Sequence, residues 1–167
     1  MAKRIVSTLT LTPTQTNDTT ALADATYPFL LQGGSTTQRV NVLEIYLGGQ
    51  AGSSTPTFML LSRDTTIAVT NSNGTGQTDA PLDASTAALA APALTGNTNT
   101  TKPQRSATAH LLNLSFNAFG GIVRWVAAPG EEISIIGNTQ PLGEVSLSAA
   151  TGGTPGALGA HMIYEPF

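Results

Sequence analysis

Short runs in which apolar and polar residues alternate, each closed by glycine or proline, recur along this chain. The clearest run spans 39–47, which is rich in β-branched and aromatic residues and stops at two glycines. Such a run is typical of a β-strand, because successive side chains of a strand point to opposite faces. We expect Leu43, Ile45 and Leu47 to share the inner face of this strand.

A second clear run spans 110–117, where Leu112, Leu114 and Phe116 alternate with polar residues. A period of two would be spread around the surface of a helix, so it predicts a strand with one face in water. Similar runs predict further strands at 5–11, 26–31, 57–61, 65–70, 122–127, 132–136, 144–148 and 158–165.

Some of these runs carry additional local signals. Pro28 disfavours a central place in a sheet, so 26–31 is expected to be a short edge strand or the approach to one. The polar residues 62–64 predict a hairpin or a bulge within one long strand. Residues 1–12 are expected to form a first strand or an extended arm. The alternation predicts that the following side chains are largely buried: Leu43, Ile45, Leu47, Leu112, Leu114, Phe116, Ile133 and Ile135.

The segment 71–109 interrupts this pattern. It contains no aromatic residue, valine or isoleucine but nine alanines, so it has little to contribute to a core. Asp83 or Ser85 is a candidate cap for a short alanine-rich helix that Pro92 would end. Otherwise we expect a long surface loop, which in a compact domain is usually either functional or disordered.

These elements predict an all-β fold. The chain of 167 residues is expected to form one domain, 1–167, with eight or nine strands and almost no helix. Strands in this number bury a face and dispose of their edges either as a two-sheet sandwich or as a closed barrel. The short turns of the second half favour an antiparallel sandwich, and we expect a jelly-roll-like one.

The composition argues against several classes of protein. Only 10% of the residues are charged, the net charge is −3, and there is no cysteine. A coiled coil, a disulfide scaffold, a zinc module and a membrane-spanning helix are therefore not expected. The basic residues are scattered, which does not favour nucleic-acid binding. The N-terminal residues lack the apolar segment of a Sec signal peptide, so synthesis in a host cytoplasm is expected.

Candidate catalytic residues are few. His110 and His161 each lie within a predicted strand, and a Ser-His-Asp site would need Ser115 or Ser148 with one of the aspartates. No Gly-x-Ser-x-Gly sequence supplies a nucleophile elbow. Two histidines on paired strands are also a candidate metal site, but no carboxylate cluster accompanies them. We expect half-buried, hydrogen-bonded histidines or histidines that face a neighbouring subunit.

The acidic residues are expected to be structural. Glu131 and Glu132 resemble a carboxylate pair for glycoside hydrolysis, but neighbours on a strand point to opposite faces, which favours a solvated turn. Candidate calcium loops pair Asp18 and Asp24 with Asn17, or pair Asp79 with Asp83, but without EF-hand spacing the alternative is turn capping.

Three aromatic residues are candidates for a sugar platform: Trp125, Tyr46 and Tyr164. A single tryptophan in a strand is more often part of a core or an interface. We therefore predict no catalytic, cofactor-binding or metal-binding residue, and a protein that is not an enzyme.

The segment Arg124–Ile135 combines an aromatic strand, a Pro129-Gly130 corner and an alternating strand. It resembles the corner between consecutive late strands in viral and tumour-necrosis-factor-like jelly rolls. The hydroxyl-rich, cysteine-free, charge-poor chain with its aromatic terminal strand also resembles jelly-roll decoration, or cement, proteins of tailed bacteriophage capsids. It is similar to phage tail-tip and fibre domains as well. The resemblance to decoration proteins implies a trimer or another multimer that clamps neighbouring capsid subunits from outside.

The expected function is therefore that of a structural virion protein. It would lie on the capsid exterior and bind the major capsid protein or other virion subunits, thereby stabilising an assembled phage shell. A receptor- or glycan-binding domain of a phage tail tip or fibre is the alternative. We also expect self-association that buries either the N-terminal arm or the 71–109 segment, because a surface of Thr, Ser and Ala loses its water at little cost.

Overall fold

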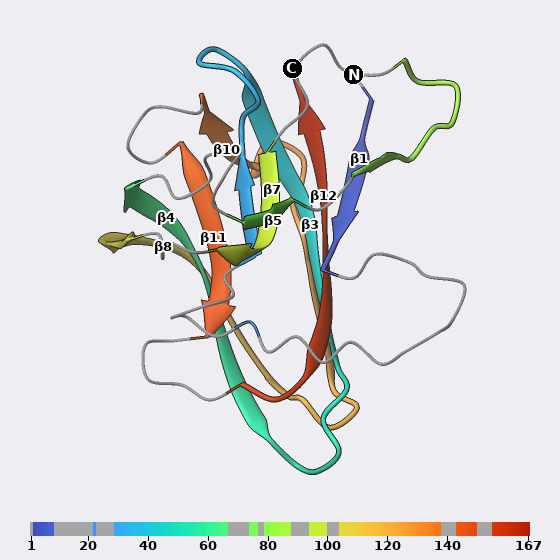
Figure 1. Ribbon diagram of the computed structural model, residues 1–167, viewed down its shortest axis with the longest axis vertical. Helices are drawn as coiled ribbons and strands as arrows, with labels where there is room; N and C mark the ends of the chain where they lie inside the picture. Colours follow the sequence, from blue (N-terminus) through green and yellow to red (C-terminus); the bar gives the residue numbers. More distant parts are fainter. Residues whose placement is uncertain are drawn as a thin grey trace.

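The structure is a computed structural model that describes residues 2–8, 22, 29–66, 74–76, 79–87, 94–99, 104–137, 143–149 and 155–167. These residues form twelve strands and no helix. The strands make two antiparallel six-stranded sheets that pack against each other (Figure 1). The prediction of an all-β antiparallel sandwich is confirmed.

We name the two sheets A and B. Sheet A runs in the order β10, β3, β12, β1, β6, with β9 also paired to β3. Its strands are β1 (Arg4–Ser7), β3 (Arg39–Gly49), β6 (Ala80–Pro81), β9 (Ile122–Val126), β10 (Ile133–Ile136) and β12 (Leu158–Pro166). Sheet B runs in the order β5, β7, β2, β11, β4, β8. Its strands are β2 (Phe29–Gln32), β4 (Pro56–Thr66), β5 (Gly74–Gly76), β7 (Leu94–Asn99), β8 (Gln104–Asn117) and β11 (Glu144–Ala149).

The connectivity is jelly-roll-like. The chain crosses between the sheets from β1 to β2, β2 to β3 and β3 to β4, then through the short strand β6 from β5 to β6 and β6 to β7, and again from β8 to β9, β10 to β11 and β11 to β12. The late strands insert between early ones, since β12 lies between β1 and β3 and β11 lies between β2 and β4. Two overlapping Greek keys produce this arrangement. β9 and β10 both pair with β3, so they are two parts of one edge interrupted by a turn at Gly130, which has a φ of 86°.

The core lies between the sheets and contains most of the predicted side chains. Ile45, Leu47, Leu114 and Ile135 are buried. Leu112, Phe116 and Ile133 are half-buried and pack against that core. The long strand β4 replaces the two runs at 57–61 and 65–70, and its register with β8 shifts after Leu61. The bulged long strand is therefore confirmed, and residues 67–70 lie outside the described part of the chain.

The predicted inner face of β3 is correct at Ile45 and Leu47 but not at Leu43. In the pairing of β3 with β12, Ile163 lies opposite Glu44 and Tyr164 lies opposite Val42. Leu43 is therefore the extra residue of a β-bulge, which reverses the alternation. Val40 and Val42 are buried before the bulge, while Leu43 itself is half-buried.

The segment 71–109, predicted as a surface loop, contains strands. β6 pairs with β1, β7 pairs with β2, and β5 pairs with β7. The loop prediction is wrong for these residues, because an edge strand can recruit backbone hydrogen-bonding groups from a segment that has no core side chains. For the same reason β2 is internal, so an edge position is wrong for this short strand, while residues 26–28, including Pro28, lie outside the described part of the chain. The strand count rises from the predicted eight or nine to twelve.

The candidate helix does not begin at Asp83. The Asp83 Oδ1 atom accepts hydrogen bonds from Ser85 N at 2.9 Å and Ser85 Oγ at 2.7 Å. Thr86 N donates to the Asp83 carbonyl oxygen at 3.0 Å, so these residues form a turn. Residues 88–93, including Pro92, lie outside the described part of the chain.

A buried polar cluster links the 71–109 segment to sheet A through hydrogen bonds. Arg4 on β1 donates through Nε to Asp79 Oδ2 and through Nη2 to Asp79 Oδ1 at 3.2 Å. Tyr164 on β12 also donates to Asp79 Oδ2. Burial opposes ionisation of Asp79, but the hydrogen bonds from Arg4 and Tyr164 together hold its pKa below the usual range. Burial and the bond to Asp79 raise the pKa of Tyr164.

Replacing Tyr164 with phenylalanine keeps the buried ring but removes the hydroxyl that donates to Asp79. We expect Tyr164→Phe to lower the free energy of unfolding by about 1.5–3 kcal/mol, the range for a hydrogen bond to a charged group. Urea denaturation measures this change. Glu131→Gln, an exposed turn residue, is the matched control and should leave the unfolding free energy unchanged.

The lowered pKa of Asp79 also predicts a pH dependence. Its contribution to stability is present above the pKa of an unfolded aspartate and is lost as the pH falls through the lower folded pKa. The acid-side loss of stability should therefore be shallower in Asp79→Asn than in the wild type. Equal slopes in denaturation curves from neutral to acid pH would contradict this assignment.

Candidate interaction site

Four polar and aromatic side chains meet on the outer face of sheet A. Arg124 on β9 donates through Nε to Glu44 Oε1 at 2.8 Å and through Nη2 to Glu44 Oε2 at 2.7 Å. His161 Nε2 on β12 lies 3.5 Å from Glu44 Oε1. The Tyr46 and His161 rings stack with centroids 4.9 Å apart and planes 7° apart. We call these four residues the Glu44 cluster.

The strand register explains how these side chains meet. Tyr46 lies opposite His161 on one side of β3 and opposite Arg124 on the other. Glu44 lies two positions along β3, on the same face, where a long guanidinium side chain can reach it diagonally. The cluster therefore spans three neighbouring strands from β9 through β3 to β12.

Within the cluster, the charges of Arg124 and Glu44 cancel each other. The hydrogen bond from Arg124 lowers the pKa of Glu44, although burial acts in the opposite direction. The Glu44 side chain is 12% exposed, whereas the Arg124 side chain is 59% exposed. The carboxylate is thus neutralised within the sheet, while the flat guanidinium group remains open to a partner.

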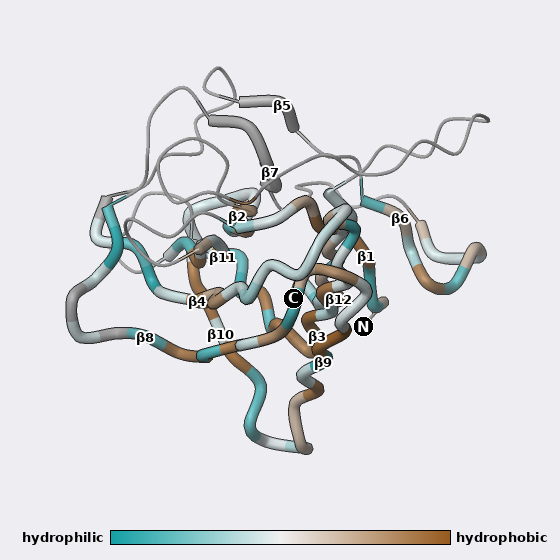
Figure 2. The backbone as a smooth tube through the Cα atoms, turned by 90° about the horizontal axis from the view of Figure 1, so that it is seen from below, coloured by the Kyte–Doolittle hydropathy of each residue, from teal (hydrophilic) through white to brown (hydrophobic). Residues whose placement is uncertain are grey.

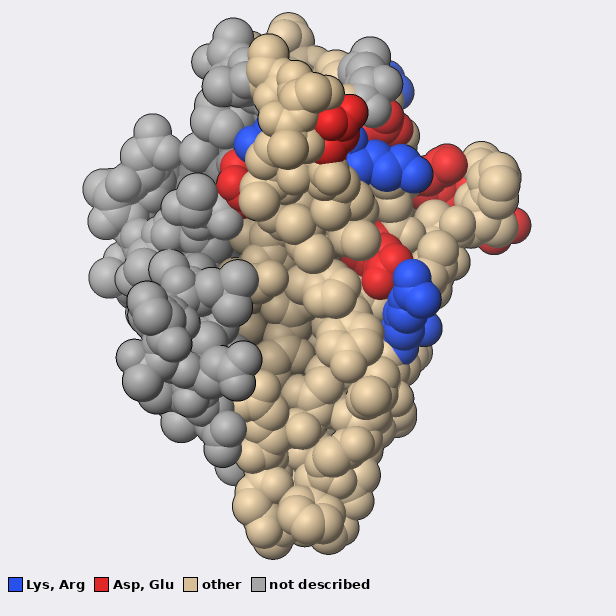
Figure 3. All heavy atoms as spheres, turned by 90° about the vertical axis from the view of Figure 1, so that its right-hand side faces the viewer, with Lys and Arg blue, Asp and Glu red and all other residues tan. Residues whose placement is uncertain are grey.

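Apolar side chains flank this cluster. Ile122 and Val126, the neighbours of Arg124 on the outer face of β9, are 65% and 54% exposed. Figure 3 shows the side of the molecule that carries β1, with its charged side chains in the upper and middle parts and none toward the lower end of the described surface. Arginine and aromatic residues with few other charges are typical of protein–protein interfaces.

The predicted Ser-His-Asp candidates do not come together. His110 Nδ1 lies 2.9 Å from Ser62 Oγ on β4, and Ser62 is fully buried. Ser148 is also buried and accepts a hydrogen bond from Arg105. Ser115 lies opposite Phe58 on the exposed face of sheet B. None of these pairs combines an accessible hydroxyl with a histidine base.

The sequence did not reveal Ser62 as the partner of His110. The two residues pair across β4 and β8 only because the register shifts between Leu61 and Ser62. His110 lies in sheet B and His161 in sheet A, so they do not share a site. Within the described ranges, no three His, Asp or Glu side chains are grouped as metal ligands would be.

The remaining acidic candidates fall in turns or in the buried cluster. Glu132 Oε1 accepts a hydrogen bond from Gly130 N at 3.1 Å, and Glu131 is exposed in the same turn. Asp79 bonds Arg4, whereas Asp83 caps its own turn. The other calcium candidates lie outside the described residues: Asn17, Asp18 and Asp24.

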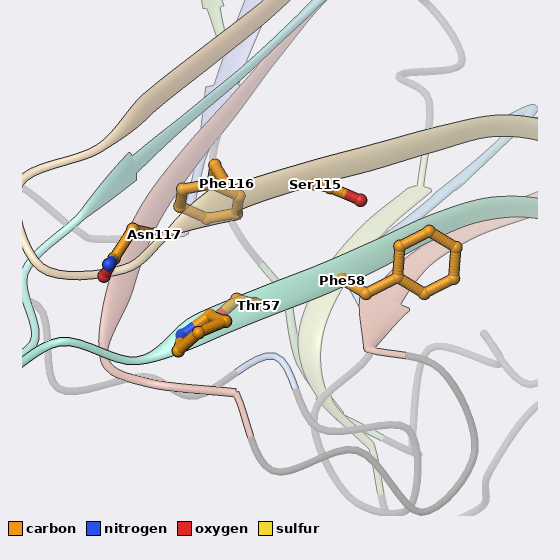
Figure 4. Close-up of a pocket in the computed structure, with 6 residues that line it drawn as sticks. Thr57, Phe58, Ser115, Phe116 and Asn117 are labelled. Carbon is orange, nitrogen blue, oxygen red and sulfur yellow. The ribbon is translucent and has the colours of Figure 1, made fainter.

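The candidate sugar platform is not formed, and Trp125 packs against the core as its place in a strand favoured. Trp125 is half-buried against the core and Tyr164 is fully buried, whereas Tyr46 lies on the outer face of sheet A. A different aromatic depression of about 410 Å³ lies where β4 begins and β8 ends (Figure 4). Its lining residues are Pro56, Thr57, Phe58, Ser115, Phe116 and Asn117.

No family model, curated protein or solved structure matches this chain. Among the described residues there is also no helix of the length and apolar character needed to cross a membrane.

Neither histidine is expected to act in catalysis. Glutamine can still hydrogen-bond to Ser62 and Glu44, so the double variant His110→Gln and His161→Gln should change the unfolding free energy by no more than about 1 kcal/mol. Calorimetry checks the fold, and a hydrolase screen checks both proteins for turnover. A turnover in the wild type that either substitution abolishes, with the fold intact, would make the protein an enzyme.

Proposed function

We propose that this chain is a structural virion protein, a decoration or cement protein that binds an assembled phage shell from outside and stabilises it. The observation that carries this proposal is the outer face of sheet A. There the charges of Arg124 and Glu44 neutralise each other, and the exposed side chains of Ile122 and Val126 lie beside this pair. The partner would be the major capsid protein or another virion subunit.

The chemistry of this face suits binding better than catalysis. Because Arg124 already bonds Glu44, covering the pair does not leave an isolated charge without a partner. Covering Ile122 and Val126 removes apolar surface from water, at about 25 cal/mol for each Å². The stacked Tyr46 and His161 rings add a rigid surface that loses little conformational entropy on binding.

Binding alone is sufficient for the proposed stabilisation. A protein that binds the assembled shell but not its separated subunits shifts the equilibrium towards assembly by mass action. Several linked copies raise the effective concentration of the remaining copies once the first is bound. The resemblance to phage decoration proteins adds the expectation of a trimer on the capsid exterior.

The depression between β4 and β8 favours a second candidate, a receptor- or glycan-binding domain of a tail tip or fibre. Phe58 is 43% exposed at its border, and Phe119 in the following turn is 58% exposed. Aromatic rings beside the polar side chains of Ser115 and Asn117 are a surface on which a sugar can stack. This depression lies in sheet B, away from the Glu44 cluster.

Gradient sedimentation of native particles tests the leading proposal. We expect the protein to migrate with intact particles, and added protein to bind particles from which it has been stripped. Stripped particles should release their nucleic acid at a lower temperature than decorated ones. A protein that stays at the top of the gradient and does not bind stripped particles would contradict the proposal.

Matched variants locate the binding face. Ile122→Asp with Val126→Asp introduces charge beside the Glu44 cluster, so binding to stripped particles should weaken by at least about tenfold. Leu82→Asp alters an exposed leucine outside this face and serves as the control that should still bind. Glycan binding that Phe58→Ala abolishes, without particle binding, would favour the tail-tip function.

A further inference from the structure

β8 is an open edge of sheet B. It is the last strand in the order of that sheet, and among the described residues β4 is its sole pairing partner. The strand is fourteen residues long, whereas strands in globular proteins are usually shorter. The pairing of β8 with β4 is regular from Leu112 to Asn117, and this part of the edge presents a regular row of backbone donors and acceptors.

The residues that present these groups follow from the register. Ala118 N donates to Thr55 O at 2.9 Å, and the two residues continue the pairing in which Asn117 lies opposite Pro56. Residues of an antiparallel strand bond the neighbouring strand at every second position. Phe116 and Leu114 therefore bond β4, while the backbone N–H and C=O groups of Ser115 and Asn113 point away from it.

Among the described residues, the regular part of this edge, from Leu112 to Asn117, lacks the usual protection. Natural edges carry lysine, inward charges, proline, β-bulges or a covering segment that prevents pairing with another chain, and the register shifts of β8 all lie on the N-terminal side of Leu112. Between Ser106 and Asn117 there is no Lys, Arg, Asp, Glu or Pro. The edges of β1 and β2, by contrast, are paired with β6 and β7.

The apolar core is also partly open on this side of the sandwich. The half-buried apolar side chains that pack against the core lie on β8, β9 and β10: Leu111, Leu112, Phe116, Val123, Trp125 and Ile133. β8 and β9 contact each other where the chain passes from one sheet to the other. Figure 2 shows β8 and β9 on the side of the molecule opposite β7.

We propose that β8 pairs antiparallel with β8 of a second copy of this chain, so that the two B sheets join into one continuous sheet. The binding partner is another strand, because the outward N–H and C=O groups of β8 are arranged as a neighbouring strand would need them. A second copy is the occupant because antiparallel self-pairing of 106–117 opposes no like charges. Self-pairing of β9 would instead bring Arg124 of one copy close to Arg124 of the other.

Such an interface is isologous, with the same residues on both sides of a two-fold axis. It differs from the trimer that the resemblance implies. The inference rests on the proposed function only in that a structural virion protein is expected to self-associate.

Ser115→Pro tests the pairing because it removes one outward N–H group, and proline is tolerated on an edge strand where its missing donor faces away from the sheet. Sedimentation velocity at micromolar concentration should show a dimer for the wild type and for the control Ser115→Ala. The dimer of Ser115→Pro should dissociate at least about tenfold more readily. Circular dichroism and thermal unfolding check that the variant folds.

Cysteine cross-linking gives an independent test, since the chain contains no cysteine. Thr108→Cys, Asn113→Cys and Ser115→Cys, made one at a time, sample different positions along the edge. A disulfide needs Cα atoms about 4.4–6.8 Å apart, so at least one of these variants should form a covalent dimer on oxidation. Ser134→Cys, exposed on β10, is the control that should remain monomeric in denaturing electrophoresis.

A wild-type monomer, a dimer or trimer that Ser115→Pro leaves intact, or cross-linking at Ser134 but not on β8, would each overturn the pairing. None of these results decides whether the protein binds particles, because that is measured separately in the gradient. Particle binding without a β8 dimer would leave the decoration role standing. A β8 dimer that binds no particle would remove the decoration role and keep the pairing.

Discussion

The need to satisfy the backbone groups at sheet edges determines much of this structure. A two-sheet sandwich has four edges, and each presents donors and acceptors that water or another strand must satisfy. Here β6 covers the edge of β1, and β7 with β5 extends the sheet beyond β2. A segment almost without core-forming side chains is thus retained because its backbone completes both sheets. The edges at β8 and at β9 with β10 stay open among the described residues.

Two ion pairs among the described residues connect strands. The Arg4–Asp79–Tyr164 cluster joins β1 and β12 to the residue just before β6, which fixes the covering strand in place. The Arg124–Glu44 pair joins the open strand β9 to β3. Both carboxylates have pKa values below their usual range because of their arginine partners, with Tyr164 also contributing at Asp79. Much of the remaining surface carries hydroxyl, amide and apolar groups, which are covered at less cost than ions.

The period-two pattern predicted the principal strands correctly, because burial on one face of a sheet imposes alternation directly on the sequence. It failed where structure depends on a partner strand. The bulge at Leu43 arises where β3 changes its pairing from β9 to β10, and nothing in 39–47 marks that position. Within 71–109, β6 pairs with β1 and β7 pairs with β2 through backbone hydrogen bonds, which leave no period-two pattern in the sequence.

The candidate site also depends on which strands become neighbours, so it could not be predicted from the local pattern. Glu44, Arg124 and His161 are separated by long stretches of sequence, and only the order of β9, β3 and β12 brings them together. Tyr46 was singled out as an aromatic residue, but its partner is His161 rather than Trp125. The scarcity of histidine and of charged residues was readable from composition. The identity of the interacting residues was not, because register and sheet order are properties of the whole chain.

The two surfaces with apolar character lie on different sheets, and this separation has a consequence for assembly. The outer face of sheet A carries the Glu44 cluster, whereas β8 is the far edge of sheet B. Pairing through β8 would therefore leave both copies of the sheet A face uncovered. A pair would then present two identical faces, and binding of the first would raise the effective concentration of the second on a repetitive surface such as a capsid. A weak contact at each face is then compatible with stable attachment, so neither surface has to be extensively hydrophobic.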